Sequence, residues 1–270
     1  MLSSESLVQE ARERGMPGVK MRGILREYVQ VLLLAELYGM KGGNRLHFTG
    51  GTSLRLVENV GRFSEDLDFN TWNTGRGAFE EMIRGTMKGM ERRGFTVGAG
   101  FEHRGRLSVA RLSFPGLERQ YGIDPSRSRA GGLMIKMETN LPLWKRAPEP
   151  KIVAGFGEII PVPCTPLPAL MADKVDAAIR KNRARHLYDL AVLLGRKTPV
   201  DAQVWRKLGG EGDALDRLLE RIKHLRPEDL KRMAESLRPF LFDEREARLV
   251  GEAGVIFSEL VRQARASSSR

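Results

Sequence analysis

The chain has 270 residues, one cysteine, 45 lysines and arginines against 34 acidic residues, and a formal net charge of +11. The single Cys164 excludes an internal disulfide and a cysteine-based zinc site, and no run approaches the roughly 20 apolar residues that span a bilayer. The N-terminal residues lack the basic start and apolar core of a secretory signal, so we expect a cytoplasmic protein with no membrane partner. The basic charge favours an anionic partner, such as nucleic acid or a polyphosphate.

The first part of the sequence predicts alternating helices and strands. Apolar residues recur at helical spacing between residues 22 and 38, and glycines end that helix. In chain order we expect a helix over 22–38, a strand over 45–49, a helix over 53–60, a strand over 64–70, a helix over 77–94, antiparallel strands over 95–99 and 107–114 joined by a turn at 103–106, and a strand over 133–141.

The second part is almost entirely helical by its periodicity. Two proline-containing stretches, 142–150 and 161–168, are predicted connectors because proline interrupts regular structure. From Leu167 onward, apolar residues follow helical spacing. We therefore expect an α+β fold with two domains: residues 1–165 with a small mixed or antiparallel sheet flanked by helices, and residues 166–270 as a C-terminal α-helical domain.

The most informative pattern is Gly50-Gly51-Thr52-Ser53 followed by Asp66-Leu67-Asp68. Glycines let backbone N–H groups approach a phosphate, and a helix that starts at Thr52 or Ser53 directs the positive end of its dipole at the same anion. On a strand, Asp66 and Asp68 share one face. Two such carboxylates can hold Mg²⁺ against a triphosphate. Each half of the pattern also occurs by chance, so it is their order that favours a nucleotide site.

A third carboxylate is predicted from the strand over 133–141, whose polar face carries Lys136 and Glu138. If this strand adjoins that of Asp66 and Asp68, Glu138 becomes a further metal ligand. The alternative is a solvent-exposed face, on which lysine and glutamate are ordinary.

Two polar residues lie on apolar helical faces in the second part. Lys174 follows Leu170 by one turn, and Asp189 lies among leucines. Lys174 either extends along the edge of the core or binds phosphate. A buried acid needs a partner, so Asp189 either pairs with Arg185 along its helix or is directed at substrate or Lys174.

A cluster of cations lies between these two positions. Arg180, Lys181, Arg183 and Arg185 fall within six residues that contain no acid. A solvated helix face usually mixes both signs of charge, so this cluster is a candidate surface for an RNA backbone.

Together these motifs resemble the AbiEii/AbiGii-type nucleotidyltransferases, toxin components of bacterial abortive-infection and related toxin–antitoxin systems that include the mycobacterial MenT group. The resemblance covers most of the chain and is carried by residues 48–54, 62–69, 172–175 and 185–190. The family often has an acid where this chain has His186, so only Asp189 can be carried over in the last segment.

The resemblance implies a DNA-polymerase-β-like domain, a helical domain, and transfer of a nucleotide from an NTP with Mg²⁺ or Mn²⁺. It implies that Asp66 and Asp68 are metal carboxylates, that Lys174 binds triphosphate, and that Asp189 is an essential acid. The expected catalytic set is Asp66, Asp68, Lys174 and Asp189, and the expected nucleotide-binding set is Gly50, Gly51, Thr52, Ser53, Ser64 and Lys174.

The expected acceptor is RNA, since several MenT-type relatives modify tRNA 3′ ends, and a cognate antitoxin and a role in phage defence are expected from the same resemblance. Two alternatives remain open. The first is nucleotidyl transfer to a protein or small molecule, and the basic charge argues against the small molecule. The second is a catalytically silent RNA-binding module, against which the intact acids and Lys174 argue.

Overall fold

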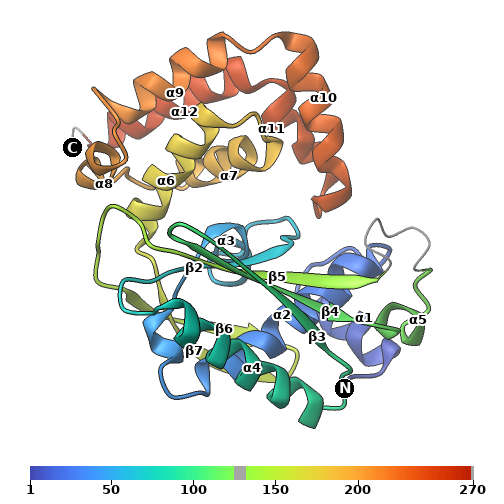
Figure 1. The fold of residues 1–270 in the computed structure, drawn as a ribbon. Helices are drawn as coiled ribbons and strands as arrows, with labels where there is room; N and C mark the ends of the chain where they lie inside the picture. The colour runs from blue at the N-terminus through green and yellow to red at the C-terminus, as the bar shows by residue number, and fades with distance from the viewer. Residues whose placement is uncertain (125–131, 269–270) are drawn as a thin grey trace. The chain divides into compact units, whose positions relative to one another are not determined.

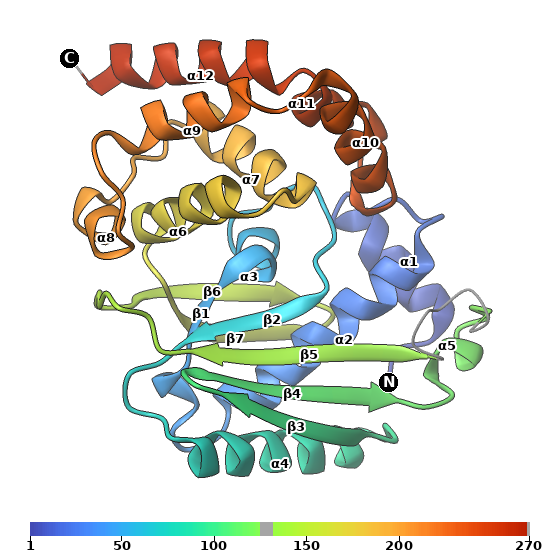
Figure 2. The same cartoon turned by 45° about the horizontal axis from the view of Figure 1, so that its top comes forward.

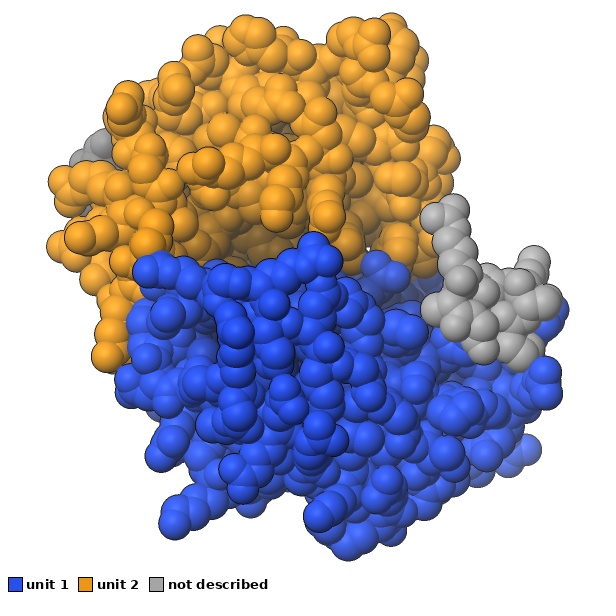
Figure 3. Space-filling model, viewed as in Figure 1, with its two compact units in different colours: residues 1–142, 148–164 blue, residues 143–147, 165–270 orange. Residues whose placement is uncertain are grey.

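The computed structural model describes residues 1–124 and 132–268, which form two compact units (Figure 1). Unit 1 comprises Met1–Pro142 and Pro148–Cys164, and unit 2 comprises Leu143–Ala147 together with the chain from Thr165 onward (Figure 3). Among the described helices, none has both the length and the apolar character needed to cross a bilayer.

Unit 1 is built on one mixed sheet, with strands in the order β3-β4-β5-β2-β1-β7-β6 within the described residues (Figure 2). Neighbouring strands are antiparallel except for two parallel pairs, β1 with β7 and β2 with β5. Its strands are β1 His47–Thr49, β2 Asp66–Asn70, β3 Gly98–Arg104, β4 Leu107–Phe114, β5 Leu133–Asn140, β6 Glu149–Gly155 and β7 Glu158–Cys164. Its helices are α1 Ser4–Glu13, α2 Met21–Tyr38, η1 Gly43–Arg45, α3 Gly50–Leu56, α4 Arg76–Arg92 and α5 Leu117–Gln120.

Helices α2 and α4 pack against each other and against one face of this sheet. The apolar sequence of α2 buries most of its residues, including Leu33 and Leu37. In β2, Leu67 and Phe69 are buried while Asp66 and Asp68 are partly exposed, and the ring of Phe69 meets that of Tyr38 from α2. The strand alternation predicted from the sequence is therefore confirmed, and the two acids lie on the face opposite α2.

The predicted connector over 161–168 is wrong, because its first half is the strand β7. Pro161 and Pro163 lie two residues apart, so both missing N–H groups fall on the same edge of the strand. The other edge keeps its donors, and β7 pairs with β1 at Cys164 and with β6 along its length. Whether this segment can form a strand thus depends more on the spacing of its prolines than on their number.

Several element boundaries also differ from the sequence-based prediction, and the strand expected over 95–99 is instead β3, Gly98–Arg104. The turn expected at 103–106 is shorter, because β3 runs to Arg104 and pairs with Leu107 of β4. Gly105 has a φ of +56°, which suits a tight turn. Helix α3 begins at Gly50 instead of at Thr52 or Ser53, so both glycines belong to its first turn.

Unit 2 is helical, as predicted, and α7 is its central element, since it packs against α6, α10, α11 and α12. The buried residues of α7 are mainly leucines and alanines, together with Tyr188 and Asp189. Its elements are α6 Leu167–Arg180, α7 Ala184–Gly195, α8 Ala202–Lys207, α9 Ala214–Lys223, α10 Pro227–Leu237, η3 Arg238–Phe240, η4 Glu244–Ala247, α11 Arg248–Gly251 and α12 Ala253–Ser268.

The short segment Leu143–Ala147 is attached to unit 2 by polar contacts. Arg146 binds Asp201 with two hydrogen bonds, from Nε to Oδ2 at 2.7 Å and from Nη2 to Oδ1 at 2.9 Å. Asp201 also caps α8 by accepting from the backbone N–H groups of Gln203 and Val204. The Arg146 guanidinium and these N–H groups lower the pKa of Asp201 to about 2.

Candidate functional site

The turn between β1 and α3 brings the backbone close to an aspartate of β2. Gly50 has a φ of +79°, a conformation that other residues rarely adopt. A Cβ added to Gly50 would lie 2.2 Å from Asp68 Oδ2. Glycine is therefore required twice at this position, for its backbone conformation and for the space that the Asp68 carboxylate occupies.

The hydroxyls of Thr52 and Ser53 are used inside unit 1. Thr52 Oγ1 donates to the carbonyl of Asp66, which joins α3 to β2. Ser53 is hydrogen-bonded to Cys164. Burial raises the pKa of the Cys164 thiol to about 12, although this hydrogen bond acts to lower it. Both residues are almost fully buried. What this turn offers to an anion is therefore the backbone N–H groups of the first turn of α3 more than these hydroxyls.

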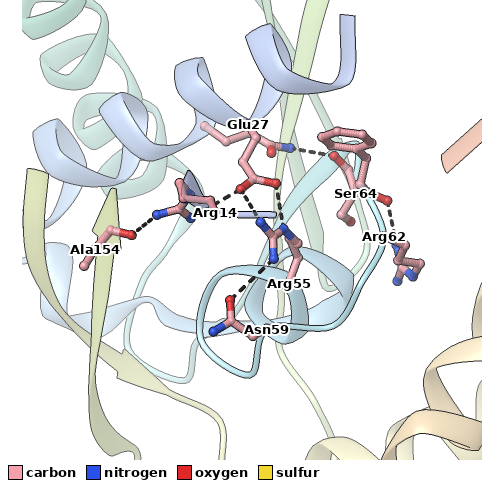
Figure 4. Close-up of polar contacts among 9 residues, drawn as sticks. Arg14, Glu27, Arg55, Asn59, Arg62, Ser64 and Ala154 are labelled. Carbon is pink, nitrogen blue, oxygen red and sulfur yellow. Dashed lines mark hydrogen bonds and ion pairs between the residues drawn. The ribbon is translucent and has the colours of Figure 1, made fainter. Parts of the chain in front are cut away.

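Arg62 and Ser64 lie beside Gly51, and the sequence assigned no role to Arg62. A Cβ on Gly51 would lie 2.7 Å from Arg62 Nη2 and 2.8 Å from Ser64 Oγ. The Arg62 side chain is buried, and its Nη1 donates to the carbonyl of Phe63 at 3.0 Å (Figure 4). The buried guanidinium of Arg62 and the hydroxyl of Ser64 thus flank the first turn of α3. The periodicity of the sequence does not predict this placement.

A buried ion cluster anchors α3 from its C-terminal half (Figure 4). Arg55 of α3 binds Glu27 of α2 through Nε at 2.9 Å and Nη2 at 3.0 Å, and both side chains are almost fully buried. Arg14 adds a contact of 3.3 Å to Glu27 and donates to the carbonyl of Ala154 in β6. A bidentate pair fixes both distance and orientation, so α3 and its glycine turn are held rigidly on unit 1.

The carboxylates of β2 meet those of β5 in register. In this parallel pair, Asp66 lies opposite Lys136, and Asp68 lies opposite Glu138. Side chains opposite each other share a face of the sheet, so Glu138 lies beside the aspartates on an adjoining strand, as the parity of the sequence predicted. Lys136 Nζ is 2.8 Å from Glu138 Oε2 and 3.3 Å from Asp66 Oδ2.

The charges around Lys136 oppose the effect of its partial burial. Burial lowers the pKa of the ammonium, but the hydrogen bond to Glu138 and the negative charges of Asp66, Glu138 and Asp68 together raise it above its usual value. Lys136 is therefore charged near neutral pH and offsets part of the negative charge of the acids.

These acids suit a hard divalent cation. Asp66 and Glu138 have side chains that are 34% and 26% exposed, so solvent reaches their oxygen donors. Carboxylate oxygens are the ligands that Mg²⁺ prefers, and two of them leave positions for phosphate oxygens. Over residues 1–124 and 132–268, no three His, Cys, Asp or Glu side chains already converge on one point, and Lys136 lies between Asp66 and Glu138. The chemistry of the donor set fits Mg²⁺ held through Asp66 and Asp68.

In unit 2, the two polar residues of the apolar helical faces bind each other. Lys174 Nζ of α6 lies 2.6 Å from Asp189 Oδ2 of α7, and the residues are 7% and 0% exposed. Lys174 therefore does not extend into solvent along the core. Arg185, the other partner considered for Asp189, lies one turn earlier on α7, and its guanidinium is 6.0 Å from the ring centre of Phe240.

His186 lies one helical turn before Asp189. Neither ring nitrogen has solvent contact or a hydrogen-bond partner among the described residues. Burial, followed by the positive charge of Lys174, lowers the pKa of His186 to about 3. This imidazole is neutral at physiological pH, in contrast to the acid that the related family often has at this position.

Asp173, next to Lys174, has the opposite shift. Burial raises its pKa to about 7, although a hydrogen bond from Trp144 Nε1 at 3.1 Å lowers it. In the folded state the neutral acid thus persists at pH values far above about 3.9, the pKa of an aspartate in an unfolded chain.

The raised pKa of Asp173 predicts a pH-dependent loss of stability. The stabilising contribution is complete below pH ~4 and is lost as the pH rises to about 7, because only the folded state resists ionisation. Asp173→Asn keeps an oxygen for Trp144 and cannot ionise. We expect it to raise the melting temperature by roughly 3–6 °C at pH 8 and hardly at all near pH 4. Thermal unfolding followed by circular dichroism at both pH values tests this, and an equal shift at both would contradict the assigned pKa.

The predicted RNA-binding cluster lies at the junction of α6 and α7. Lys181 and Arg183 are exposed in the connecting segment. Arg180 is also exposed, but it binds Asp176 at 2.6 Å and the carbonyl of Leu208 at 3.1 Å. Two cations of the cluster, Lys181 and Arg183, are thus presented on the surface of unit 2 for an anionic ligand.

Comparison with known proteins gives one family. The family model described as the AbiEii nucleotidyl transferase toxin of type IV toxin–antitoxin systems matches residues 32–253. A search of curated proteins gave no significant match.

Three solved structures match this chain, two of them with a TM-score above 0.5. The nucleotidyltransferase toxin MenT4, Rv2826c of Mycobacterium tuberculosis H37Rv, is 21% identical with a TM-score of 0.54, covering 98% of this chain and 94% of its own. A candidate nucleotidyltransferase from H. pylori is 16% identical with a TM-score of 0.56, covering 91% and 97%. JHP933 from Helicobacter pylori is 17% identical with a TM-score of 0.48, covering 92% and 97%.

Proposed function

The chain belongs to the AbiEii family of toxin nucleotidyltransferases, and from this premise we propose that it transfers a nucleoside monophosphate from an NTP to RNA, such as a tRNA 3′ end. The observation that carries the proposal is the pair Asp66 and Asp68 on one face of β2, with the glycine turn of α3 against Asp68. Such a turn brings phosphate to carboxylates that can hold a metal ion.

We assign the metal ligands to Asp66 and Asp68, with Glu138 as the candidate third carboxylate. A Mg²⁺ or Mn²⁺ ion held there would help to activate the attacking hydroxyl and would neutralise charge on the pyrophosphate leaving group. The chain would contribute positioning: the first turn of α3 offers its N–H groups to a phosphate, and the Ser64 hydroxyl lies beside Gly51 in the same turn.

Within unit 2 we assign Lys174 to the triphosphate and Asp189 to holding its ammonium. The contact of 2.6 Å supports the second role, because a bonded carboxylate orients the amine and stabilises its charged form. Lys181 and Arg183 are the proposed contacts to the RNA backbone, since phosphates dominate such binding. Membership in a toxin family also supports a cognate antitoxin as a partner.

A labelling experiment tests the reaction and its acceptor. The full chain is incubated with each α-³²P-labelled NTP, Mg²⁺ and total RNA, and label is followed into the tRNA fraction. We expect label in RNA that depends on Mg²⁺ and is lost with a chelator. Label that enters the protein fraction or a small molecule would assign a different acceptor, and no label with any NTP would contradict the proposal.

The glycine turn gives a first mutational prediction. Gly50→Ala places a Cβ 2.2 Å from Asp68 Oδ2 and needs a φ of +79°. The carboxylate has to move, and a displacement of about 1 Å at a reacting centre can cost ~10²-fold in rate. We expect that loss in the RNA-labelling rate.

Gly42→Ala is the matched control for this change. Gly42 has a φ of +93° but no atom within 4 Å of an added Cβ. It should therefore share the backbone cost, of order 1 kcal/mol, and keep the labelling rate. Equal rates for the two variants would contradict the role of the turn.

A further inference from the structure

Lys136 of β5 contacts one candidate metal carboxylate on the neighbouring strand β2 and another on its own strand. Its ammonium is 3.3 Å from Asp66 Oδ2 and 2.8 Å from Glu138 Oε2. One cation therefore bonds to a member of the Asp-x-Asp pair and to the candidate third ligand at the same time.

The backbone determines this placement. Lys136 lies directly opposite Asp66 in the parallel pair of β2 and β5, and neighbouring strands are ~4.8 Å apart. On the other side of β5, Arg111 of β4 also lies opposite Lys136, but it binds Glu102 at 2.9 Å. Of these two cations, Lys136 is thus the one directed at the acids.

We propose that Lys136 competes with the divalent metal ion for Asp66 and Glu138 and so sets the metal affinity of this site. The inference rests on the proposed metal role of Asp66 and Asp68. A divalent ion bonded to Asp66 repels an ammonium a few ångströms away. The lysine must therefore either leave the carboxylate or weaken the binding of the ion to it. Lys136 is therefore a positioning residue that holds the two carboxylates and balances their charge until a stronger cation displaces it.

Metal binding of single variants tests the competition directly. Mn²⁺ is titrated into the full chain, and free Mn²⁺ is followed by electron paramagnetic resonance. We expect Lys136→Met to bind Mn²⁺ about tenfold more tightly than the wild type, because one repulsive charge is removed. Lys136→Arg keeps the charge and should retain the wild-type affinity.

Lys151→Met is the matched control. Lys151 is also a partly exposed lysine between two carboxylates of unit 1, at 3.5 Å from Glu149 and 3.8 Å from Glu58. Its removal changes the net charge equally but should leave Mn²⁺ affinity within about twofold of the wild type, since distant charges are screened.

A stability measurement separates this role from a purely structural one. In EDTA, Lys136→Met should melt at a lower temperature than the wild type, because its carboxylates repel one another. Added Mg²⁺ should remove this difference in melting temperature. If Lys136 only packed against its neighbours, the melting temperature of Lys136→Met would stay low after Mg²⁺ is added.

Two results would overturn the inference. One leaves the proposed metal site intact, and the other contradicts it as well. If Lys136→Met binds Mn²⁺ no more tightly than the wild type, while Asp68→Asn abolishes binding, the competition is wrong and the metal role of Asp68 stands. If Asp68→Asn leaves wild-type Mn²⁺ binding unchanged, the proposed metal site fails and the inference fails with it.

Discussion

Asp68→Asn should abolish nucleotidyl transfer while leaving the fold intact. The amide is nearly the same size as the carboxylate, but it removes the charge that we propose holds a divalent ion beside the glycine turn. Loss of one electrostatic contact to a transition state typically costs ~10²–10³-fold, and a metal ligand belongs at the upper end of that range. We expect the RNA-labelling rate to fall by at least ~10²-fold with an unchanged circular dichroism spectrum.

Glu102→Gln is the control for this prediction. Glu102 lies on β3 of the same sheet, is 31% exposed like Asp66 at 34%, and binds Arg111 as Asp66 binds Lys136. Removing its charge should leave the labelling rate within about twofold, because exposed ion pairs contribute little. If Asp68→Asn labels RNA at the wild-type rate, the acids of β2 are not the metal ligands.

Asp189→Asn should destabilise unit 2 more than any surface substitution. Lys174 is 7% exposed and has its ammonium 2.6 Å from Asp189, so the variant leaves a buried cation without its counter-charge. Breaking a buried pair in this way costs ~3–5 kcal/mol. Urea unfolding of the full chain measures this loss, and Asp176→Asn, which breaks an exposed pair with Arg180, should cost only ~0.5 kcal/mol.

The double variant Lys174→Met with Asp189→Leu separates stability from chemistry. Replacing both charges with apolar groups removes the uncompensated ion, and such replacements are often neutral or stabilising. We expect stability within ~1 kcal/mol of the wild type but no transfer of label to RNA. A double variant that is stable and still active would show that the pair only holds α6 to α7.

How far the sequence predicts this site depends on the range of each interaction. The acids of β2, their common face, and the polar positions of Lys174 and Asp189 followed from patterns within a few residues. The pairing of β5 with β2 joins segments more than sixty residues apart. The sequence suggested this pairing only as a condition, because both strands carry polar residues on one face. A period of two shows which side chains share a face, but it does not show which strands become neighbours.

Lys136 illustrates the same limit. It was visible as one polar residue of a strand, with no sign that its ammonium lies between Asp66 and Glu138. Arg62 lies outside the helices and strands, so no period marks it, and the partners Glu27 and Arg55 lie on two different helices. The strand β7 is also not predicted, because prolines usually interrupt a strand and the sequence does not show how this edge of the sheet is paired.

By itself, the sequence determined most helices and strands of unit 1 before residue 141, the helical character of unit 2, the glycine turn, the two acids of β2 and the family of the chain, because these rest on local spacing and side-chain chemistry. It did not determine β6 and β7. The tertiary structure decided the order of the strands, the start of α3 at Gly50 and the partners of Lys136, Lys174 and Asp189. The physical reason is that a charge removed from water needs a counter-charge, and the fold alone determines which distant residue supplies it.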